Sequence, residues 1–144
     1  YLLKIEPMAE SVMVHDAARP CLQHVDIDVL LGVGIKASAG AILAVPAKDT
    51  LKQVSEDGDI VATLDRSALW HALTPQLFPL KTLMTALESV TASGQAVTDE
   101  ASAMELTGRS PKIVKGHATN LKITVPEDLP LAEAILRSQG RLVS

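Results

Sequence analysis

The pattern of apolar and polar residues predicts a first part built from a strand, a helix and a strand. Residues 11–16 are a short apolar run that ends at a polar pair, which is typical of a buried strand entering a loop. Apolar residues recur at roughly helical spacing over 25–37, although glycines weaken this prediction. Residues 40–46 form a continuous apolar run between Gly and Pro, which favours a strand buried on both faces. Together these segments predict a parallel βαβ unit.

The next stretch, 50–65, predicts a β-hairpin. Polar and apolar residues alternate around Asp57-Gly58, a strong signal for a two-residue turn, and each arm would have about seven residues. An isolated two-stranded hairpin is marginally stable in water, so we expect this one to pack on something else, a second subunit being one candidate. Its apolar face would carry Ile60, Ala62 and Leu64.

Helix and strand signals alternate over the rest of the chain. Pro79 is favourable in a first turn and Gly94 after a last turn, so a helix is predicted over roughly 79–93. A second helix would be capped by Thr98 and would end at Gly108. The remaining predictions are strands at 112–115 and 121–125 and a final helix over 126–136. This order indicates an α/β sheet domain with an inserted arm.

Composition narrows the classes of function. The 144 residues, 47% of them hydrophobic, suffice for one domain but not for two. A net charge of -4 and only one Trp, one Tyr and one Phe argue against nucleic-acid binding, which needs a basic surface or stacking platforms. No apolar run approaches the ~20 residues of a membrane helix. The single cysteine, Cys21, excludes an internal disulfide and suits a reducing compartment, so a cytoplasmic location is expected.

The first predicted strand ends at residues that can bind phosphate and a metal ion. Ligands of open parallel sheets bind outside the carboxyl ends of the strands, where this strand delivers His15, Asp16 and Arg19. A carboxylate there can hold Mg²⁺ against phosphate oxygens, and a guanidinium can bind a phosphate through two hydrogen bonds. A turn whose Asp caps local amides and whose Arg is solvated fits the same residues. His15 itself is expected to be a packed, hydrogen-bonded residue.

Other polar positions are less specific. The base of the hairpin is basic and its tip acidic, which also suits a solvated arm of mixed charge. Residues 70–78 hold two of the aromatic residues in one predicted loop, which indicates either a functional loop or a plug under the sheet. Thr98 is expected to cap a helix, with ligand contact as an alternative, and Lys122 is expected on a strand. The four histidines show no metal-ligand spacing, so no zinc site is predicted.

In combination, six short motifs are similar in order and spacing to one family. They are 15–20, 49–52, Asp65-Arg66 followed by Leu69-Trp70, 74–78, 98–102 and 120–122. These motifs resemble the 2-C-methyl-D-erythritol 4-phosphate cytidylyltransferases of the non-mevalonate route to isoprenoid precursors. The resemblance implies one Rossmann-like domain of the nucleotide-diphospho-sugar transferase fold over 1–144, with a hairpin dimerisation arm at 47–66.

The resemblance covers only the second part of that family's chain. In the family, a glycine-rich loop with an Arg and a Lys wraps the nucleotide triphosphate, and no such run precedes Asp16. We therefore expect a domain that lacks its N-terminal part, and we expect the isolated 144-residue chain to be inactive.

The family's reaction transfers CMP from CTP to methylerythritol phosphate and releases pyrophosphate without a covalent enzyme intermediate. Such a transfer requires the protein to hold two anions together and to neutralise the charge that builds on the phosphorus. The resemblance implies that Asp16 binds Mg²⁺, that Asp16, Ala17 and Arg19 bind the nucleotide, and that Lys122 stabilises the transition state. Asp16 and Lys122 are thus the implied catalytic residues. The residues implied to hold the sugar phosphate are Thr50, Arg66, Thr74, Thr98 and Lys122.

The resemblance also implies the partners. The family's arm crosses to the other subunit of a two-fold dimer, so Thr50 and Arg66 would reach the partner's pocket in a homodimer. CTP and methylerythritol phosphate are the other expected partners, and neither nucleic acid nor membrane is expected. No carboxylate occurs over 117–120, so a single carboxylate is expected to anchor Mg²⁺.

Two alternatives remain open. A pentitol-phosphate cytidylyltransferase would share the fold and use a different acceptor. A non-catalytic dimerisation or ligand-binding fragment would release no pyrophosphate even when the missing part is supplied.

Overall fold

A mixed four-stranded sheet organises residues 9–142, the part of the chain that the computed structural model describes. The central strand β5 is antiparallel to both of its neighbours, β1 and β2, whereas β2 and β6 are parallel. The strands in sheet order are β1 (Ser11–Val14), β5 (Trp70–Pro79), β2 (Ala41–Pro46) and β6 (Lys112–Lys115). The helices are α2 (His24–Gly34), α3 (Leu80–Ser93), α4 (Glu100–Leu106) and α5 (Asp128–Ser138).

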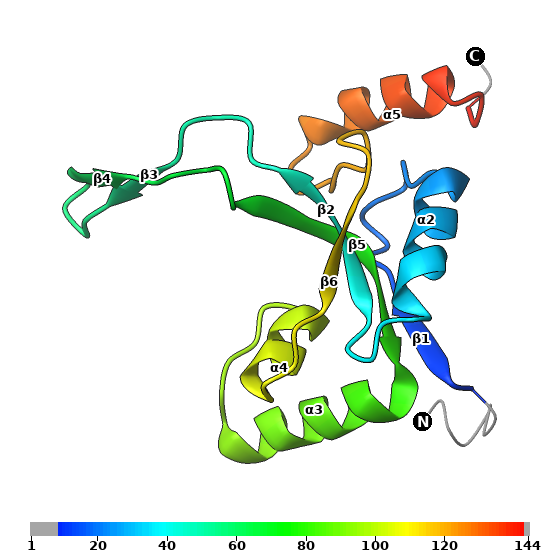
Figure 1. The fold of residues 1–144 in the computed structure, drawn as a ribbon. Helices are drawn as coiled ribbons and strands as arrows, with labels where there is room; N and C mark the ends of the chain where they lie inside the picture. The colour runs from blue at the N-terminus through cyan, green and yellow to red at the C-terminus, as the bar shows by residue number, and fades with distance from the viewer. Residues whose placement is uncertain (1–8, 143–144) are drawn as a thin grey trace.

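The sheet is covered on both faces, as the apolar run of β2 predicts. Ala41 and Leu43 pack with Leu30 of α2 on one face, and Ile42 packs in the cluster formed with α3 and α4 on the other. This alternation follows from the two-residue period of side chains along a strand. In Figure 1, α2 and the α3–α4 pair accordingly lie on opposite sides of the strands.

The prediction of a loop over residues 70–78 is wrong, because this segment lies within the ten-residue strand β5. A proline within a strand normally argues against a central position, since it has no N–H for the ladder. Here Pro75 lies opposite a register shift between Ile42 and Ala44 of β2, where the ladder is interrupted. Because β5 is antiparallel to both β1 and β2, these two strands run in the same direction, as the predicted βαβ unit requires. However, β5 lies between them in the sheet.

Most predicted helices are confirmed with shifted ends. α3 begins after Pro79 and ends at Ser93, and Gly94, with a φ of 67°, provides the left-handed cap. The N-cap of α4 is Asp99 rather than Thr98, and its side chain accepts a hydrogen bond from the Ser102 amide at 2.9 Å. Residues 121–125, predicted as a strand, have no regular structure, so Lys122 lies on a loop. α2 ends earlier than predicted, at Gly34.

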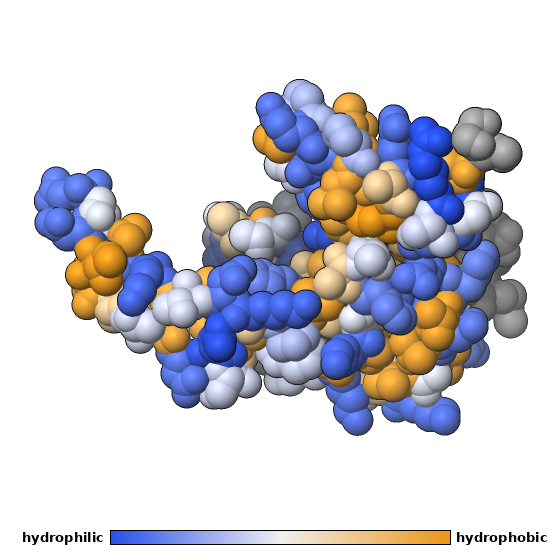
Figure 2. Space-filling model, turned by 90° about the horizontal axis from the view of Figure 1, so that it is seen from above, coloured by the Kyte–Doolittle hydropathy of each residue, from blue (hydrophilic) through white to orange (hydrophobic). Residues whose placement is uncertain are grey.

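The predicted hairpin projects from the body as a separate two-stranded sheet, β3 (Lys52–Val54) and β4 (Ile60–Thr63) (Figure 1). Both strands are shorter than predicted, and the turn is longer. The Gly58 amide donates to the Ser55 carbonyl, and Gly58 has a φ of 88°, which is typical of a three-residue loop with glycine in the left-handed position. Figure 2 shows hydrophobic residues gathered along this arm. The exposed ones are Val54, Ile60, Val61 and Leu64, whereas Ala62 is half-buried.

Gly40→Ala should lower the free energy of unfolding by roughly 2–4 kcal/mol. Gly40 has a φ of 78°, and a Cβ there would lie 2.2 Å from the Leu77 carbonyl oxygen, which the rigid ladder cannot move. Gly58→Ala is the matched control, because its φ is also positive but no atom lies within 4 Å. It should cost only about 1–2 kcal/mol. Urea denaturation measures both, and equal losses would contradict the role of the close approach.

No helix within the described residues is long and apolar enough to cross a membrane.

Candidate functional site

A cavity of about 440 Å³ opens where β1 ends. We call it the Asp16 cavity. Its wall combines the end of β1, the middle of β5, the residues that lead into α4, and the loop that follows β6. The structure therefore brings together five of the predicted site residues from distant parts of the sequence. They are Asp16, Arg19, Thr74, Thr98 and Lys122.

An ion pair lies at the centre of this wall. Lys122 Nζ lies 2.8 Å from Asp16 Oδ2, and the side chains are 50% and 26% exposed, so both are accessible to a ligand. Asp16 Oδ1 accepts a hydrogen bond from the Ala18 amide at 3.0 Å, which confirms that this carboxylate also caps its own turn. The hydrogen bond from Lys122 and then that from Ala18 lower the pKa of the Asp16 carboxyl.

A ¹³C NMR titration of the Asp16 carboxyl should give a pKa below 3.8, the ordinary value. Lys122→Met should raise this pKa towards 3.8, because it removes the largest cause of the shift. Since the pKa is lowered in the folded state, the stabilisation is present above 3.8 and is lost as the pH falls through the lower value. Lys81→Met on the exposed face of α3 is the control and should leave the titration unchanged. If Lys122→Met and Lys81→Met changed the pKa of Asp16 equally, a specific pair of Asp16 and Lys122 would be excluded.

Arg19 and Thr74 are held by a buried asparagine. The Asn120 carbonyl accepts a hydrogen bond from Arg19 Nη1 at 2.8 Å, and Asn120 Nδ2 donates to the Thr74 carbonyl at 2.7 Å. Asn120 is 1% exposed. Partial burial lowers the pKa of Arg19, whereas Asp16 raises it. Asn120 belongs to one of the six motifs, but the sequence alone indicates no role for it, because its burial depends on contacts with two distant segments.

The Thr74 hydroxyl also connects β5 to the end of β1. It accepts a hydrogen bond from the Asp16 amide at 2.9 Å and lies 3.0 Å from His15 Nδ1. His15 Nε2 in turn lies 3.2 Å from the Arg19 carbonyl oxygen. His15 is therefore hydrogen-bonded as predicted, but it is exposed, so the expectation of a packed residue is wrong.

Thr98 lies at the exposed edge of the cavity, next to a buried polar bridge that sequence reasoning missed. Gln76 of β5 is 1% exposed. Its Nε2 donates to Asp99 Oδ2 at 2.9 Å, and its Oε1 accepts from the Ala101 amide at 3.1 Å. This bridge joins β5 to the start of α4 and thereby fixes the backbone next to Thr98.

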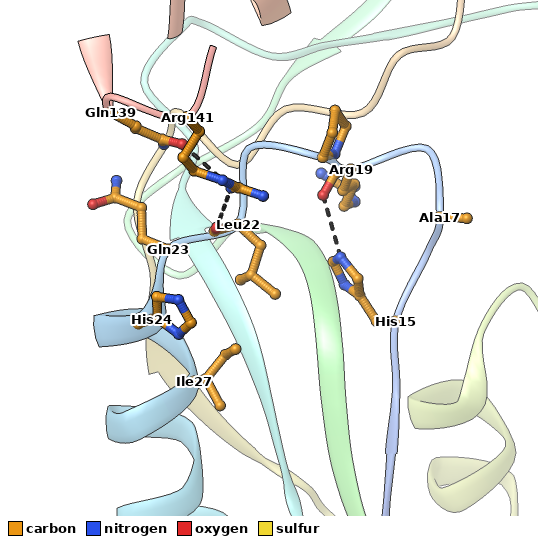
Figure 3. Close-up of a pocket in the computed structure, with 10 residues that line it drawn as sticks. His15, Ala17, Arg19, Leu22, Gln23, His24, Ile27, Gln139 and Arg141 are labelled. Carbon is orange, nitrogen blue, oxygen red and sulfur yellow. Dashed lines mark hydrogen bonds between the residues drawn. The ribbon is translucent and has the colours of Figure 1, made fainter. Parts of the chain in front are cut away.

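Three predicted residues lie elsewhere. Thr50 and Arg66 are exposed at the base of the arm, where Arg66 Nη1 donates to the Lys48 carbonyl, and neither lines the Asp16 cavity. Ala17 lines an adjacent cavity of about 650 Å³ near the start of α2. Figure 3 shows this cavity, in which Arg141 donates to the Leu22 carbonyl at 2.9 Å.

The oxygen donors of the Asp16 cavity fit a divalent cation only if a ligand supplies further oxygens. Within residues 9–142 no group of three His, Cys, Asp or Glu side chains could hold a metal ion. Asp99 also lines the cavity, but both of its carboxylate oxygens already accept hydrogen bonds. Mg²⁺ is commonly bound through one or two carboxylates together with substrate phosphates, so Asp16 fits an ion shared with a phosphate chain.

Curated relatives match most of this chain. A protein from Aliivibrio fischeri (strain MJ11), named 2-C-methyl-D-erythritol 4-phosphate cytidylyltransferase, is 54% identical over 134 residues, which are 93% of this chain and 56% of that protein. A protein of the same name from Shewanella amazonensis is 54% identical over 127 residues, 88% of this chain and 53% of that protein. The chain thus spans about half the length of the curated relatives it matches.

A crystal structure of 4-diphosphocytidyl-2C-methyl-D-erythritol synthase has a TM-score of 0.81 at 45% identity, covering 94% of this chain and 60% of its own. That of the Francisella tularensis 2-C-methyl-D-erythritol 4-phosphate cytidylyltransferase has a TM-score of 0.81 at 41% identity, covering 88% and 59%. These likenesses confirm the predicted fold class. Residues 2–138 match the family model of IspD, 2-C-methyl-D-erythritol 4-phosphate cytidylyltransferase. With its motifs, its fold and this match in agreement, the chain belongs to the 2-C-methyl-D-erythritol 4-phosphate cytidylyltransferase family.

Proposed function

We propose that this protein acts in the transfer of CMP from CTP to 2-C-methyl-D-erythritol 4-phosphate, with release of pyrophosphate. The observation that carries the proposal is the accessible pair of Asp16 and Lys122 at 2.8 Å, in a cavity also lined by Arg19 and Thr74. A carboxylate beside two cationic side chains suits the binding of two phosphorylated molecules. A neutral ligand would not require this arrangement.

In this reaction a phosphate oxygen of the acceptor attacks the α-phosphorus of CTP, and the bond from that phosphorus to the bridging oxygen of pyrophosphate breaks. Lys122 neutralises the charge that develops on the phosphorus, and Arg19 binds phosphate oxygens. Thr74 and Thr98 offer hydroxyls to the acceptor from the cavity wall. Asp16 would hold Mg²⁺, which supplies charge neutralisation on the nucleotide phosphates. An arriving phosphate takes over Lys122 from Asp16, which leaves the carboxylate oxygen free.

The proposal is tested with the 144-residue chain alone and with the chain joined to the part of the Aliivibrio fischeri relative that it does not cover. We expect the joined protein to release pyrophosphate from CTP with methylerythritol phosphate, and the chain alone to release none. A preference for ribitol 5-phosphate would favour a pentitol-phosphate cytidylyltransferase. Absence of pyrophosphate release with either acceptor would leave only the non-catalytic binding fragment.

Lys122→Ala should lower kcat of the joined protein by roughly 10²-fold and raise KM much less. Its charge is needed most when the phosphorus carries additional negative charge, so the loss falls on the transition state. Lys81→Ala serves as the control. A change in KM alone would assign Lys122 to ground-state binding.

We further propose that the arm docks on a second copy of the chain, so that Thr50 and Arg66 complete the partner's Asp16 cavity. Two observations support this: these side chains do not line their own cavity, and the arm exposes apolar side chains of both strands. Burial of that apolar surface would stabilise the dimer. The cytoplasm is the location we propose, since Cys21 is a free, buried thiol.

A further inference from the structure

Asp26 is a buried carboxylate outside the Asp16 cavity. It lies in the first turn of α2 and is 1% exposed. Its Oδ1 accepts a hydrogen bond from His117 Nδ1 at 2.7 Å, and its Oδ2 is buried without a hydrogen-bond partner. A buried carboxylate with an unsatisfied oxygen costs stability, so packing alone does not explain this residue. Asp28, two residues further along α2, is exposed.

The partner of Asp26 begins the loop that carries Lys122. His117 follows β6 after Gly116, and its carbonyl accepts a hydrogen bond from the Asn120 amide at 3.0 Å, which closes a turn. A second connection from α2 lies beside the first, because Gln23 Nε2 donates to Thr119 Oγ1 at 3.1 Å. The start of α2 therefore holds the loop at two points, His117 and Thr119.

Beyond this turn the chain enters the Asp16 cavity. Asn120 holds Arg19 and Thr74, the Ile123 amide donates to the Ala18 carbonyl at 2.8 Å, and Lys122 between them reaches Asp16. Residues 121–125 have no regular structure, so no ladder hydrogen bonds fix them. A lysine on such a segment requires other contacts to stay in place.

We propose that Asp26 and His117 form a positioning pair. They fix the turn from His117 to Asn120 to the rigid α2 and so place Lys122 in the Asp16 cavity. The catalytic part of this inference rests on the proposed function, because it assumes that Lys122 acts on the transferred phosphate. A misplacement of 1 Å at a reacting group can cost roughly 10²-fold in rate, so a pair that never contacts substrate can control turnover.

Amide hydrogen exchange of the 144-residue chain, followed by NMR, tests the positioning directly. Asp26→Leu removes the buried charge and keeps a branched side chain. We expect exchange of the Asn120 and Ile123 amides to accelerate by roughly tenfold or more. The Lys112 amide, which donates to the Gly40 carbonyl at the opposite end of β6 from His117, should be unchanged. The free energy of unfolding should stay equal or rise, because the unsatisfied Asp26 oxygen is gone and the His117 side chain, which is 54% exposed, is left in contact with water.

His117→Gln is the conservative variant, since its amide can still donate to Asp26, and it should keep both amides protected. A pair that only stabilises the fold would give the opposite pattern, in which Asp26→Leu lowers the free energy of unfolding and accelerates exchange at Lys112 as well. That result, or unchanged exchange at Asn120 and Ile123, would overturn the proposal.

In the joined protein, Asp26→Leu should lower kcat by tenfold or more and change KM by less than about twofold, whereas His117→Gln should be close to wild type. If the unsubstituted joined protein transfers no CMP, the proposed function fails, and the exchange measurements still decide the positioning. If it transfers CMP but Asp26→Leu leaves kcat unchanged, the pair has no influence on Lys122 and the inference fails alone.

Discussion

Asp16→Asn is expected to lower the rate of CMP transfer by the joined protein by roughly 10²–10³-fold. Asn has nearly the same volume, and its Oδ1 can still accept the hydrogen bond from Ala18, so the turn after β1 is preserved. What is lost is the charge that faces Lys122 and that would hold a divalent cation. Pyrophosphate release measured over a series of Mg²⁺ concentrations gives the rate, and urea denaturation checks that the fold is intact.

Asp28→Asn is the matched control, because it removes an exposed carboxylate from α2, outside the Asp16 cavity. It should leave the rate unchanged. Full activity of Asp16→Asn at saturating Mg²⁺ would remove Asp16 from the site.

Mixing two inactive variants of the joined protein, Arg66→Ala and Asp16→Asn, should restore activity to about half of the wild-type value per mixed dimer. If each arm completes the partner's site, one site of the mixed dimer receives both substitutions and the other receives neither. Each variant by itself carries a defect in every site. Pyrophosphate release after subunit exchange, with exchange followed by two affinity tags, measures the effect.

The control mixes wild-type protein with a double variant that carries Arg66→Ala and Asp16→Asn in one chain. Its expected result is the reverse of that for the two single variants. With crossing arms, both sites of that mixed dimer carry one substitution, and the mixed dimer should be inactive. If Arg66 instead serves its own subunit, the double variant leaves one intact site and the two single variants leave none. Demonstrated exchange with that reversed pattern would therefore exclude the crossing arm.

Local sequence patterns predicted the elements whose own residues determine them. The run of apolar residues in β2 and the signals at Pro79 and Gly94 need no distant partner to be interpreted. β5 was not predicted because a proline and a polar residue, Pro75 and Gln76, are unusual within a central strand. Gln76 is compatible with burial only because Asp99 and the Ala101 amide satisfy its side chain, and their position is set by tertiary structure.

The same limit applies to α2. Val25, Val29 and Val33 are among the apolar residues that recur at helical spacing, but they are 47%, 42% and 37% exposed, while Asp26 is buried on the same helix. Periodicity assigns the buried face of a helix by hydrophobicity, and it therefore predicts that Asp26 is exposed. Asp26 is buried instead, and its carboxylate accepts a hydrogen bond from His117. The candidate site residues follow from the family resemblance rather than from periodicity. Asn120 and Gln76 lie in the same motifs, but the sequence assigns them no role, since their roles depend on contacts with other segments.

The hydrogen bond between Arg19 and Asn120 fixes the guanidinium before any ligand arrives. Its orientation is established during folding, so little conformational entropy remains to be lost when an anion binds. The same placement leaves Arg19 Nε buried without a hydrogen-bond partner, which lowers the stability of the native state. Preorganisation for binding and thermodynamic stability are therefore opposed at this one side chain, and a sequence selected for stability alone would not keep an arginine there.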